Sequence, residues 1–276
     1  MIWQRIIPLL KCIKCGHDNL LLSLTGSLVC STCSHQYTNK NNIPDLMSKN
    51  MMPGSKLYTD PDYLQWETMR ASSHDYFYGS KGIISWVQAS GHQAIARMME
   101  SKQYQAIVDL GCGDGAHYPY IKQTEKYVGV DIDQPTLERF KLKQPDCCLL
   151  RVNGFELPFK DKSVDCLINI YNLEHMMYLD IALEEMNRIL TEQGDVYISV
   201  PNEGGFLWGL GRSLSSVKHY KNINYPRIIE IEHINCIWQL EKAFKRHFKI
   251  KKKEPFPFSL PGFHANIVTT YHCVKI

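Results

Sequence analysis

The pattern that most constrains the fold of this chain is an alternation of short apolar runs with amphipathic stretches through residues 105–276. Five runs have the length and composition of buried strands: 106–110, 127–130, 148–152, 164–170 and 196–200. Helical sequence, such as 136–142 and 181–190, separates several of them. Buried strands that alternate with helices form a parallel sheet with a helical layer on each face. We therefore predict a doubly wound α/β domain over residues 105–276.

The last two apolar runs, 249–253 and 266–274, are joined only by a Pro- and Gly-rich connection, residues 255–262. A parallel neighbour would need a crossover of about a dozen residues or more, whereas an antiparallel neighbour needs only a loop. This connection is too short and too broken for a crossover helix. We therefore expect the two runs to pair antiparallel and to complete a mostly parallel sheet of seven strands.

Residues 1–48 carry a different signal, which is two Cys-x-x-Cys pairs: Cys12 with Cys15, and Cys30 with Cys33. Two such turns can direct four thiolates to one point, the tetrahedral set that structural zinc prefers, with no coordination position left open. A redox pair is the alternative, but one Cys-x-x-Cys would suffice for it and no βαβ pattern surrounds either pair. So small a segment needs bound metal to fold. We predict a small zinc ribbon with a structural Zn²⁺.

Composition places the whole chain among ordinary globular proteins, with 44% hydrophobic and 21% charged residues. The six other cysteines are scattered, which favours free thiols and a cytoplasmic location. No apolar run approaches the ~20 residues of a membrane-spanning helix, and the first ten residues lack the cleavage site of a secretory signal. A net charge of +3 neither requires nor excludes a nucleic-acid partner.

Between these two parts, residues 49–104 read as a helical linker. The segment begins with turn-rich sequence and continues into an amphipathic run over 83–102. Its aromatic cluster, Tyr76, Phe77 and Tyr78, has two interpretations. The three rings belong to the core, or they form a lid over a ligand of the third part.

The glycines of V-D-L-G-C-G-D-G, Gly111, Gly113 and Gly115, follow a predicted strand and precede a predicted helix. Doubly wound sheets bind nucleotides at this position. A dinucleotide site has the spacing G-x-G-x-x-G and holds a pyrophosphate, which Asp109 and Asp114 would disfavour. An acidic mouth suits S-adenosylmethionine, an adenosine that carries an ammonium and a sulfonium group instead of phosphates.

A second acid supports this interpretation. Asp131 ends the next predicted strand, 20 positions beyond Gly111. A carboxylate at that distance accepts hydrogen bonds from the ribose hydroxyls of a bound nucleoside.

With these motifs the chain resembles the class I S-adenosylmethionine-dependent methyltransferases, which have a Rossmann-like sheet, from about residue 105 through 200 and more loosely to its end. The glycine loop is similar to their first motif, V-G-V-D131 to the second, N153-G-F-E-L-P-F to the third and I170-Y-N-L-E-H to the fourth. The family usually has Asp where Asn153 stands, and an Asn side-chain oxygen can still accept from the adenine amino group. The resemblance implies these cofactor contacts: Asp109, Gly111, Cys112, Gly113, Gly115, Asp131, Ile132, Asn153, Gly154 and Tyr171.

The implied chemistry is direct displacement at the sulfonium methyl group, in which positioning supplies much of the rate. Cys112 is then a small buried filler, because the transfer needs no covalent enzyme intermediate. His175 either orients the loop beside the cofactor or acts as a general base. Glu174 is its rival for the role of base.

The acceptor is less well defined by the sequence. Residues 202–235 begin glycine-rich, aromatic and basic, as suits a cap over an acceptor, and His233 precedes the helix from 237. The first hypothesis is a small-molecule, lipid-linked or saccharide acceptor. The second is RNA, because ribosomal RNA guanine methyltransferases also carry a four-cysteine module, and the lysine-rich stretch 245–253 either contacts RNA or keeps an edge strand soluble. The third is a non-catalytic protein that binds the cofactor.

Overall fold

The computed structural model describes residues 2–24, 26–47, 61–66, 68–69, 82–215, 220, 222–260 and 262–276. Its centre is a seven-stranded sheet with the order β10-β11-β9-β8-β5-β6-β7. The strands are β5 (Ile107–Leu110), β6 (Tyr127–Asp131), β7 (Cys148–Arg151), β8 (Val164–Ile170), β9 (Leu190–Pro201), β10 (Phe248–Phe256) and β11 (Val268–Lys275). Six strands run in the same direction, whereas β11 is antiparallel to its neighbours β9 and β10. The predicted sheet and its antiparallel closing pair are thus confirmed.

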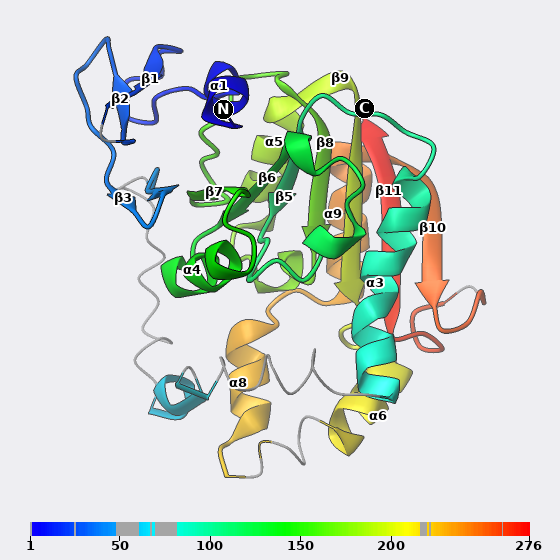
Figure 1. The fold of residues 1–276 in the computed structure, drawn as a ribbon. Coiled ribbons are helices and arrows are strands. Elements are labelled where there is room, and N and C mark those ends of the chain that lie inside the picture. Colours follow the sequence, from blue (N-terminus) through cyan, green and yellow to red (C-terminus); the bar gives the residue numbers. More distant parts are fainter. Residues whose placement is uncertain are drawn as a thin grey trace.

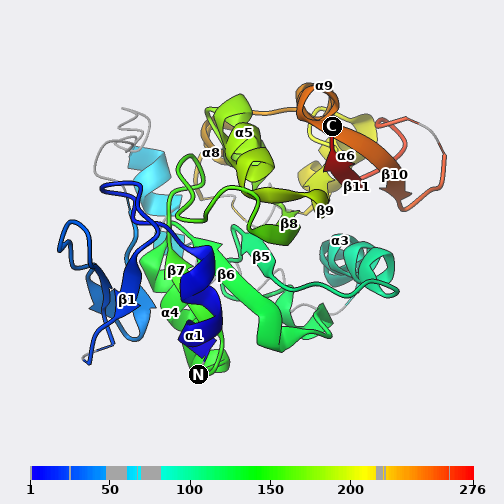
Figure 2. The ribbon, with the colours of Figure 1, turned by 90° about the horizontal axis from the view of Figure 1, so that it is seen from above.

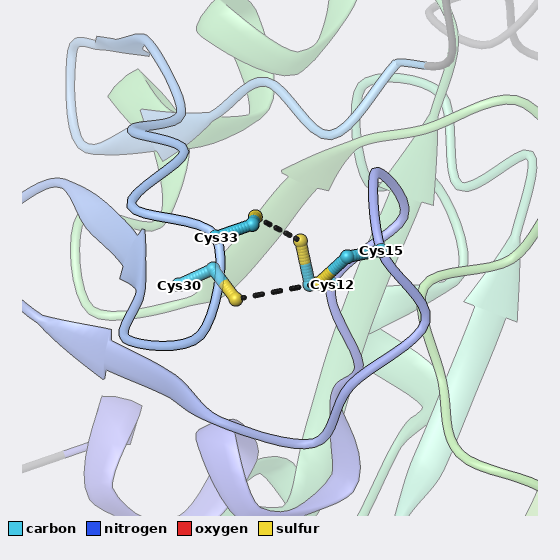
Figure 3. A group of neighbouring side chains, drawn as sticks. All are labelled: Cys12, Cys15, Cys30 and Cys33. Atoms are coloured by element: carbon cyan, nitrogen blue, oxygen red, sulfur yellow. Dashed lines mark hydrogen bonds between the residues drawn. The ribbon is translucent and has the colours of Figure 1, made fainter.

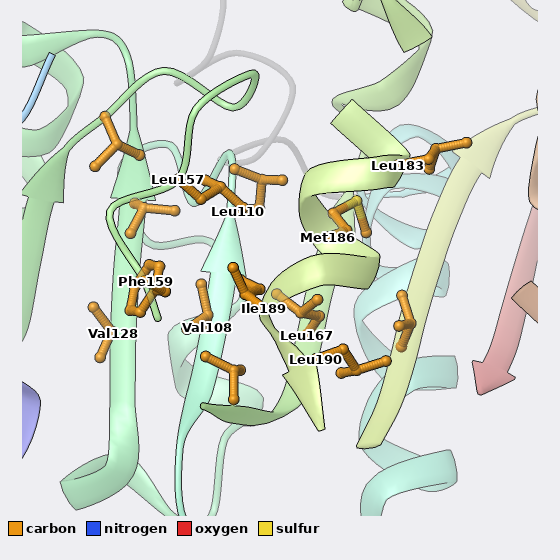
Figure 4. Packing of buried hydrophobic residues seen from close by; sticks show 14 of the residues in the cluster. Val108, Leu110, Val128, Leu157, Phe159, Leu167, Leu183, Met186, Ile189 and Leu190 are labelled. Atoms are coloured by element: carbon orange, nitrogen blue, oxygen red, sulfur yellow. The ribbon is translucent and has the colours of Figure 1, made fainter. Parts of the chain in front are cut away.

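Helices cover both faces of this sheet (Figures 1 and 2). The helices α5 (Leu179–Ile189) and α9 (Ile237–His247) pack on one face, and α3 (Ile83–Met99) and α4 (Gln134–Lys143) pack on the other. Because side chains alternate along a strand, Val108 of β5 joins the core under α5, shown in Figure 4, whereas Ile107 joins the core under α3. This two-sided burial explains why the strands read as continuous apolar runs.

The N-terminal module packs against the β7 edge of the sheet and shares its core. It consists of a short helix, a 3-10 turn and two small hairpins: α1 (Ile2–Ile6), η1 (Ile7–Leu9), β1 (Leu20–Leu22), β2 (Leu28–Cys30), β3 (Asn39–Lys40) and β4 (Ile43–Pro44). Leu10 and Leu46 are fully buried in the same cluster as the sheet residues Val128 and Leu150. Main-chain hydrogen bonds join the two parts, from Leu46 N to the Arg151 carbonyl and from Lys11 N to that of Pro158.

The structure differs from the prediction directly after the glycine loop. We expected a helix there, but residues 111–126 form only two 3-10 turns, η3 (Tyr118–Tyr120) and η4 (Thr124–Lys126). Pro119 lies in η3, and a proline that lacks an N–H does not support a longer helix at this point. No long helix therefore begins at the loop, so no helix dipole would stabilise the negative charge of a pyrophosphate bound there.

At the end of the sheet to which the parallel strands run, α6 (Phe206–Leu214) and α8 (Tyr225–Glu232) occupy the position of the predicted cap (Figure 1). The predicted lid residues Tyr76, Phe77 and Tyr78 lie outside the described residues. In the described part of the chain, no helix is long and apolar enough to cross a bilayer.

Candidate functional site

The site lies at the edge where β5, β6, β7 and β8 end, because these strands are parallel and neighbouring. The segments that follow them, residues 111–115, 132–133, 152–154 and 171–175, therefore meet at one edge of the sheet. Ligands of open α/β sheets bind at this edge.

The glycines of the loop are required for different reasons. All three have positive φ, +76° at Gly111, +55° at Gly113 and +88° at Gly115. A Cβ on Gly111 would lie 2.5 Å from the side chain of Asn172, and one on Gly115 would lie 2.4 Å from the ring of Phe140. A Cβ on Gly113 would meet only a methyl group at 4.0 Å. Gly111 and Gly115 therefore allow close packing, whereas Gly113 leaves backbone open beside the site.

Asp131 is held at the mouth of this loop. Its Oδ2 accepts a hydrogen bond from Gly113 N at 2.9 Å, and its Oδ1 accepts one from Asp133 N at 2.9 Å. The next side chain, Ile132, is apolar yet 45% exposed. A fixed carboxylate beside an exposed aliphatic side chain suits a nucleoside, with the ribose hydroxyls on the acid and the base against the apolar group.

Asp109 and Asp114, which we expected to form an acidic mouth, are both buried in the structure. Asp109 is buried within the sheet and accepts from the Tyr127 hydroxyl at 2.7 Å. Burial raises the pKa of Asp109 to about 7, against the effect of that hydrogen bond. Asp114 is also buried, and its carboxylate pairs with Lys143. The negative charge at the loop therefore comes from Asp131.

Four other predicted cofactor residues lie in or beside the loop. Asn153 is buried, and its Oδ1 accepts from Phe155 N at 3.0 Å. Tyr171 has φ +52°, and its hydroxyl lies 3.3 Å from both Gly91 N and the Gln88 carbonyl, which ties β8 to α3. The Cys112 thiol is buried, and burial holds its pKa well above the usual value, so it stays protonated. Gly154 lies beside the Met176 side chain, where a Cβ would be 2.9 Å from Cε.

Unpartnered polar atoms gather at the end of β8 and in the segment that follows it. Among the described residues, Asn169 Oδ1, Asn172 Nδ2 and Glu174 Oε2 are buried without a hydrogen-bond partner. Buried polar groups are nearly always paired, and an unpaired one costs about 1–3 kcal/mol. Asn172 also packs directly against Gly111. Three such atoms within six residues, next to the glycine loop, fit a site that a polar ligand completes.

The two candidate bases have different surroundings. Glu174 is 2% exposed, and burial raises its pKa to about 7, against the opposing charge of His175. His175 donates from Nδ1 to the Glu232 carbonyl at 2.7 Å, which joins η5 (Leu173–His175) to the end of α8. Its Nε2 lies 3.8 Å from Glu174 Oε1, too far for a hydrogen bond. His175 therefore links η5 to α8, and Glu174 is the carboxyl with an available oxygen.

A further polar cluster was missed by the sequence reasoning. Glu203 lies directly after β9 and accepts from Trp208 Nε1 at 2.7 Å, from Arg212 at 2.7 Å and from His233 Nδ1 at 2.8 Å. Burial would raise the pKa of Glu203, but the hydrogen bond and charge of His233 and the charge of Arg212 lower it to about 2. The cluster fastens α6 and the end of α8 to the sheet. Its signal in the sequence was one acid in a glycine-rich loop, which does not reveal its partners.

The four predicted metal ligands come together in the N-terminal module (Figure 3). The Sγ atoms of Cys12, Cys15, Cys30 and Cys33 all lie within 4.8 Å of one another. Cys12 and Cys33 are 3.8 Å apart, and Cys15 and Cys30 are 3.6 Å apart. Disulfides would need about 2.05 Å, whereas four ligands at about 2.3 Å around a tetrahedral zinc lie about 3.8 Å from each other. The geometry of the four thiols fits such an ion.

A cavity of about 380 Å³ opens beside the glycine loop, between α3 and the residues that follow Gly115. Trp86, His92 and Tyr120 form aromatic walls, and Gln88 and Gln93 supply polar groups. Its volume lies within the range of small-molecule sites, about 300–1,000 Å³.

Comparison with known proteins agrees with this geometry. Residues 108–198 match the family model described as a methyltransferase domain. An uncharacterised protein of Methanocaldococcus jannaschii is 36% identical over 113 residues, 41% of this chain and 48% of that protein. A Mycolicibacterium smegmatis protein, named a probable S-adenosylmethionine-dependent methyltransferase, is 27% identical over 126 residues, 45% of this chain and 49% of that protein. The chain thus spans about half the length of these curated relatives.

Two solved structures share the fold. One is a Thermotoga maritima S-adenosylmethionine-dependent methyltransferase, described as a possible histamine N-methyltransferase, with a TM-score of 0.55 and 17% identity over 80% of this chain and 99% of that one. The other belongs to a complex between the Haloferax volcanii Trm112 methyltransferase activator and a methyltransferase, with a TM-score of 0.55 and 16% identity over 76% of this chain and 97% of that one.

The fold and the site therefore define a Rossmann-like methyltransferase sheet with a four-cysteine module at its N-terminal side. Residues 108–198 match a methyltransferase domain, and this part of the chain is similar to a protein named a probable S-adenosylmethionine-dependent methyltransferase.

Proposed function

We propose that this chain is an active S-adenosylmethionine-dependent methyltransferase that acts on a small-molecule, lipid-linked or saccharide acceptor. The proposal depends on three features that lie close together. The open backbone of Gly113, the fixed carboxylate of Asp131 and the unpartnered polar atoms of residues 169–174 share one edge of the sheet. These groups fit the cofactor, whose site would be completed by Ile132 and Asn153.

Each residue of the proposed site then has a separate role. The bound cofactor supplies an electrophilic methyl group on a sulfonium. Asp131 would accept from the ribose hydroxyls, Asn153 would accept from the adenine amino group, and the glycine loop would hold the methionine portion. Glu174 would take the proton that an acceptor oxygen or nitrogen loses when it is methylated. A carboxylate with a pKa of about 7 is suited to this task, because a base works best when its pKa lies near the working pH.

The proposed acceptor class depends on the cavity and on the surface charge. The cavity beside the glycine loop has aromatic walls and the volume of a small-molecule site. Four of the six lysines and arginines in residues 245–253 form ion pairs: Lys245 and Lys253 with Glu241, Arg246 with Asp180, and Lys252 with Glu254. RNA binding needs lysines and arginines that can reach phosphates, so these pairs favour a small acceptor over RNA.

The four thiols are proposed to bind one structural Zn²⁺. Tyr37 supports the site, since its hydroxyl lies 3.1 Å from Cys12 Sγ and accepts from Ile13 N at 3.0 Å. Four thiolates leave no open position, so the ion would stabilise the module and take no part in the transfer.

The test uses S-adenosylmethionine labelled in its methyl group, incubated with the protein and with fractions of a cell extract from its source. Label is expected in the water-soluble or organic-extractable fraction. Label that enters only RNA would overturn the acceptor class. No label in any fraction, from a protein that binds the cofactor, would support a non-catalytic role. Glu174→Gln should retain cofactor binding and lose transfer, whereas Glu230→Gln, an exposed change on α8, should retain both.

A further inference from the structure

We propose that Arg151 is a positioning residue that couples folding of the four-cysteine module to cofactor affinity. Its three contacts lie on two different parts of the protein. The Arg151 Nε donates to the Ile132 carbonyl at 2.9 Å, and its Nη1 donates to Asp45 Oδ2 at 2.9 Å. Its own carbonyl accepts from Leu46 N at 2.9 Å. One side chain thus spans the module and the loop that carries Ile132.

The loop end of this link belongs to the cofactor site. Arg151 lies opposite Asp131 in the register of β6 and β7. The Ile132 carbonyl that it binds lies between Asp131 and Asp133, whose N–H fixes Asp131 Oδ1. A rotation of the Ile132 peptide would therefore move both the ribose-binding carboxylate and the exposed Ile132 side chain. The planar guanidinium suits this task because it donates in fixed directions from Nε and Nη1.

The module end of the link belongs to the cysteine cluster. Asp45 N donates to the Thr38 carbonyl at 2.8 Å, one residue after Tyr37, which contacts Cys12. Leu46 is fully buried in the hydrophobic cluster that contains Cys12 and Cys30. The position of Asp45 and Leu46 therefore depends on a folded module, and a segment of this kind folds when its metal binds.

The inference rests on the proposed function, because it concerns affinity for the proposed cofactor. It goes beyond that function by making the module part of the cofactor site. Metal loading would then tighten cofactor binding through Asp45 and Arg151, although the ion lies outside the site. By linkage, the cofactor would also stabilise the module.

The test is calorimetric titration of the full chain with S-adenosylhomocysteine, the demethylated product. Arg151→Met and Asp45→Asn should each weaken binding about three- to tenfold, the modest range expected because the ion pair is roughly one-third exposed. Arg151→Lys should weaken binding nearly as much, since a compact ammonium cannot reproduce the two separate donors that the guanidinium holds in fixed directions at Nε and Nη1. The control is Asp18→Asn, which breaks another ion pair between module and sheet domain, with Lys160 at 3.6 Å, and does not touch the cofactor loop.

Metal removal completes the experiment. Chelation should weaken binding to wild type and should weaken binding to Arg151→Met much less, because the link is already broken in that variant. Equal affinities of wild type, Asp45→Asn and Arg151→Met would overturn the inference, as would a chelation effect of the same size in wild type and Arg151→Met. Failure of wild type to bind would instead overturn the proposed cofactor. If Arg151→Met does not fold, the cofactor affinity of Asp45→Asn tests the inference by itself, because that variant leaves Arg151 in place.

Discussion

Replacement of Glu174 by Gln should stabilise the protein above neutral pH. The folded state raises the pKa of Glu174 from an ordinary 4.5 to about 7, chiefly by burial. Below pH 4.5 the carboxyl is protonated whether the chain is folded or unfolded. Above pH 7 it is ionised in both states, and the folded state must then bury a charge. Since one pH unit of pKa difference corresponds to about 1.4 kcal/mol, the full effect is about 3 kcal/mol.

The sign of this pH effect follows from the direction in which folding shifts the pKa of Glu174. Because the folded pKa is raised, stability that Glu174 contributes at low pH is lost as the pH rises from about 4.5 through about 7. Gln has the same shape and no charge. The free energy of unfolding of Glu174→Gln, measured by urea denaturation, should therefore exceed that of wild type by an amount that grows by about 3 kcal/mol between pH 4.5 and pH 8.

The control for this experiment is Glu230→Gln, because the Glu230 side chain is 68% exposed. That variant should follow the pH dependence of wild type. Asp109 also has a raised pKa, but it is present in every protein compared and its effect cancels in the difference. A difference between Glu174→Gln and wild type that stays constant from pH 4.5 to pH 8 would refute the reasoning, since it would mean that Glu174 does not titrate in this range.

Two further predictions concern the glycine loop and the metal. Gly115→Ala should lower the free energy of unfolding by about 2 kcal/mol or more, because φ is +88° and the new Cβ would lie 2.4 Å from Phe140. Thermal unfolding measures this loss. The control is Gly209→Ala on α6, which has open space around it and should be neutral or slightly stabilising. The purified protein should contain one zinc ion per chain, as measured by atomic absorption. Cys33→Ser or chelation should remove the ion and lower the melting temperature. An unchanged melting temperature after the metal is removed would contradict a structural site.

Much of the fold was predictable because burial on both faces leaves a plain pattern in the sequence. The continuous apolar runs of β5, β6 and β8, with helical sequence between several of the strands, predict a parallel sheet. The Pro- and Gly-rich connection before β11 predicts the antiparallel closure. The cysteine spacing predicts the cluster, since the geometry depends on local turns.

The predictions failed where the outcome depends on the direction of one side chain. Asp109 lies within a strand that is buried on both faces, and the sequence did not show that its carboxyl accepts from the Tyr127 hydroxyl. The helix expected after Gly115 was predicted from the usual strand–loop–helix order, and Pro119 was overlooked. The Glu203 cluster could not be predicted, because its partners Arg212 and His233 meet it only after α6 and α8 fold back on the sheet.

The most direct test of the account is isothermal titration with S-adenosylmethionine and S-adenosylhomocysteine, on wild type and on Asp131→Ala. Wild type should bind both with micromolar affinity. Asp131→Ala should weaken binding about a hundredfold or more, because two hydrogen bonds to a charged group are lost at about 1.5–3 kcal/mol each. Absence of binding by wild type would contradict the cofactor, and equal binding by Asp131→Ala would contradict the site described at the ends of β5 and β6.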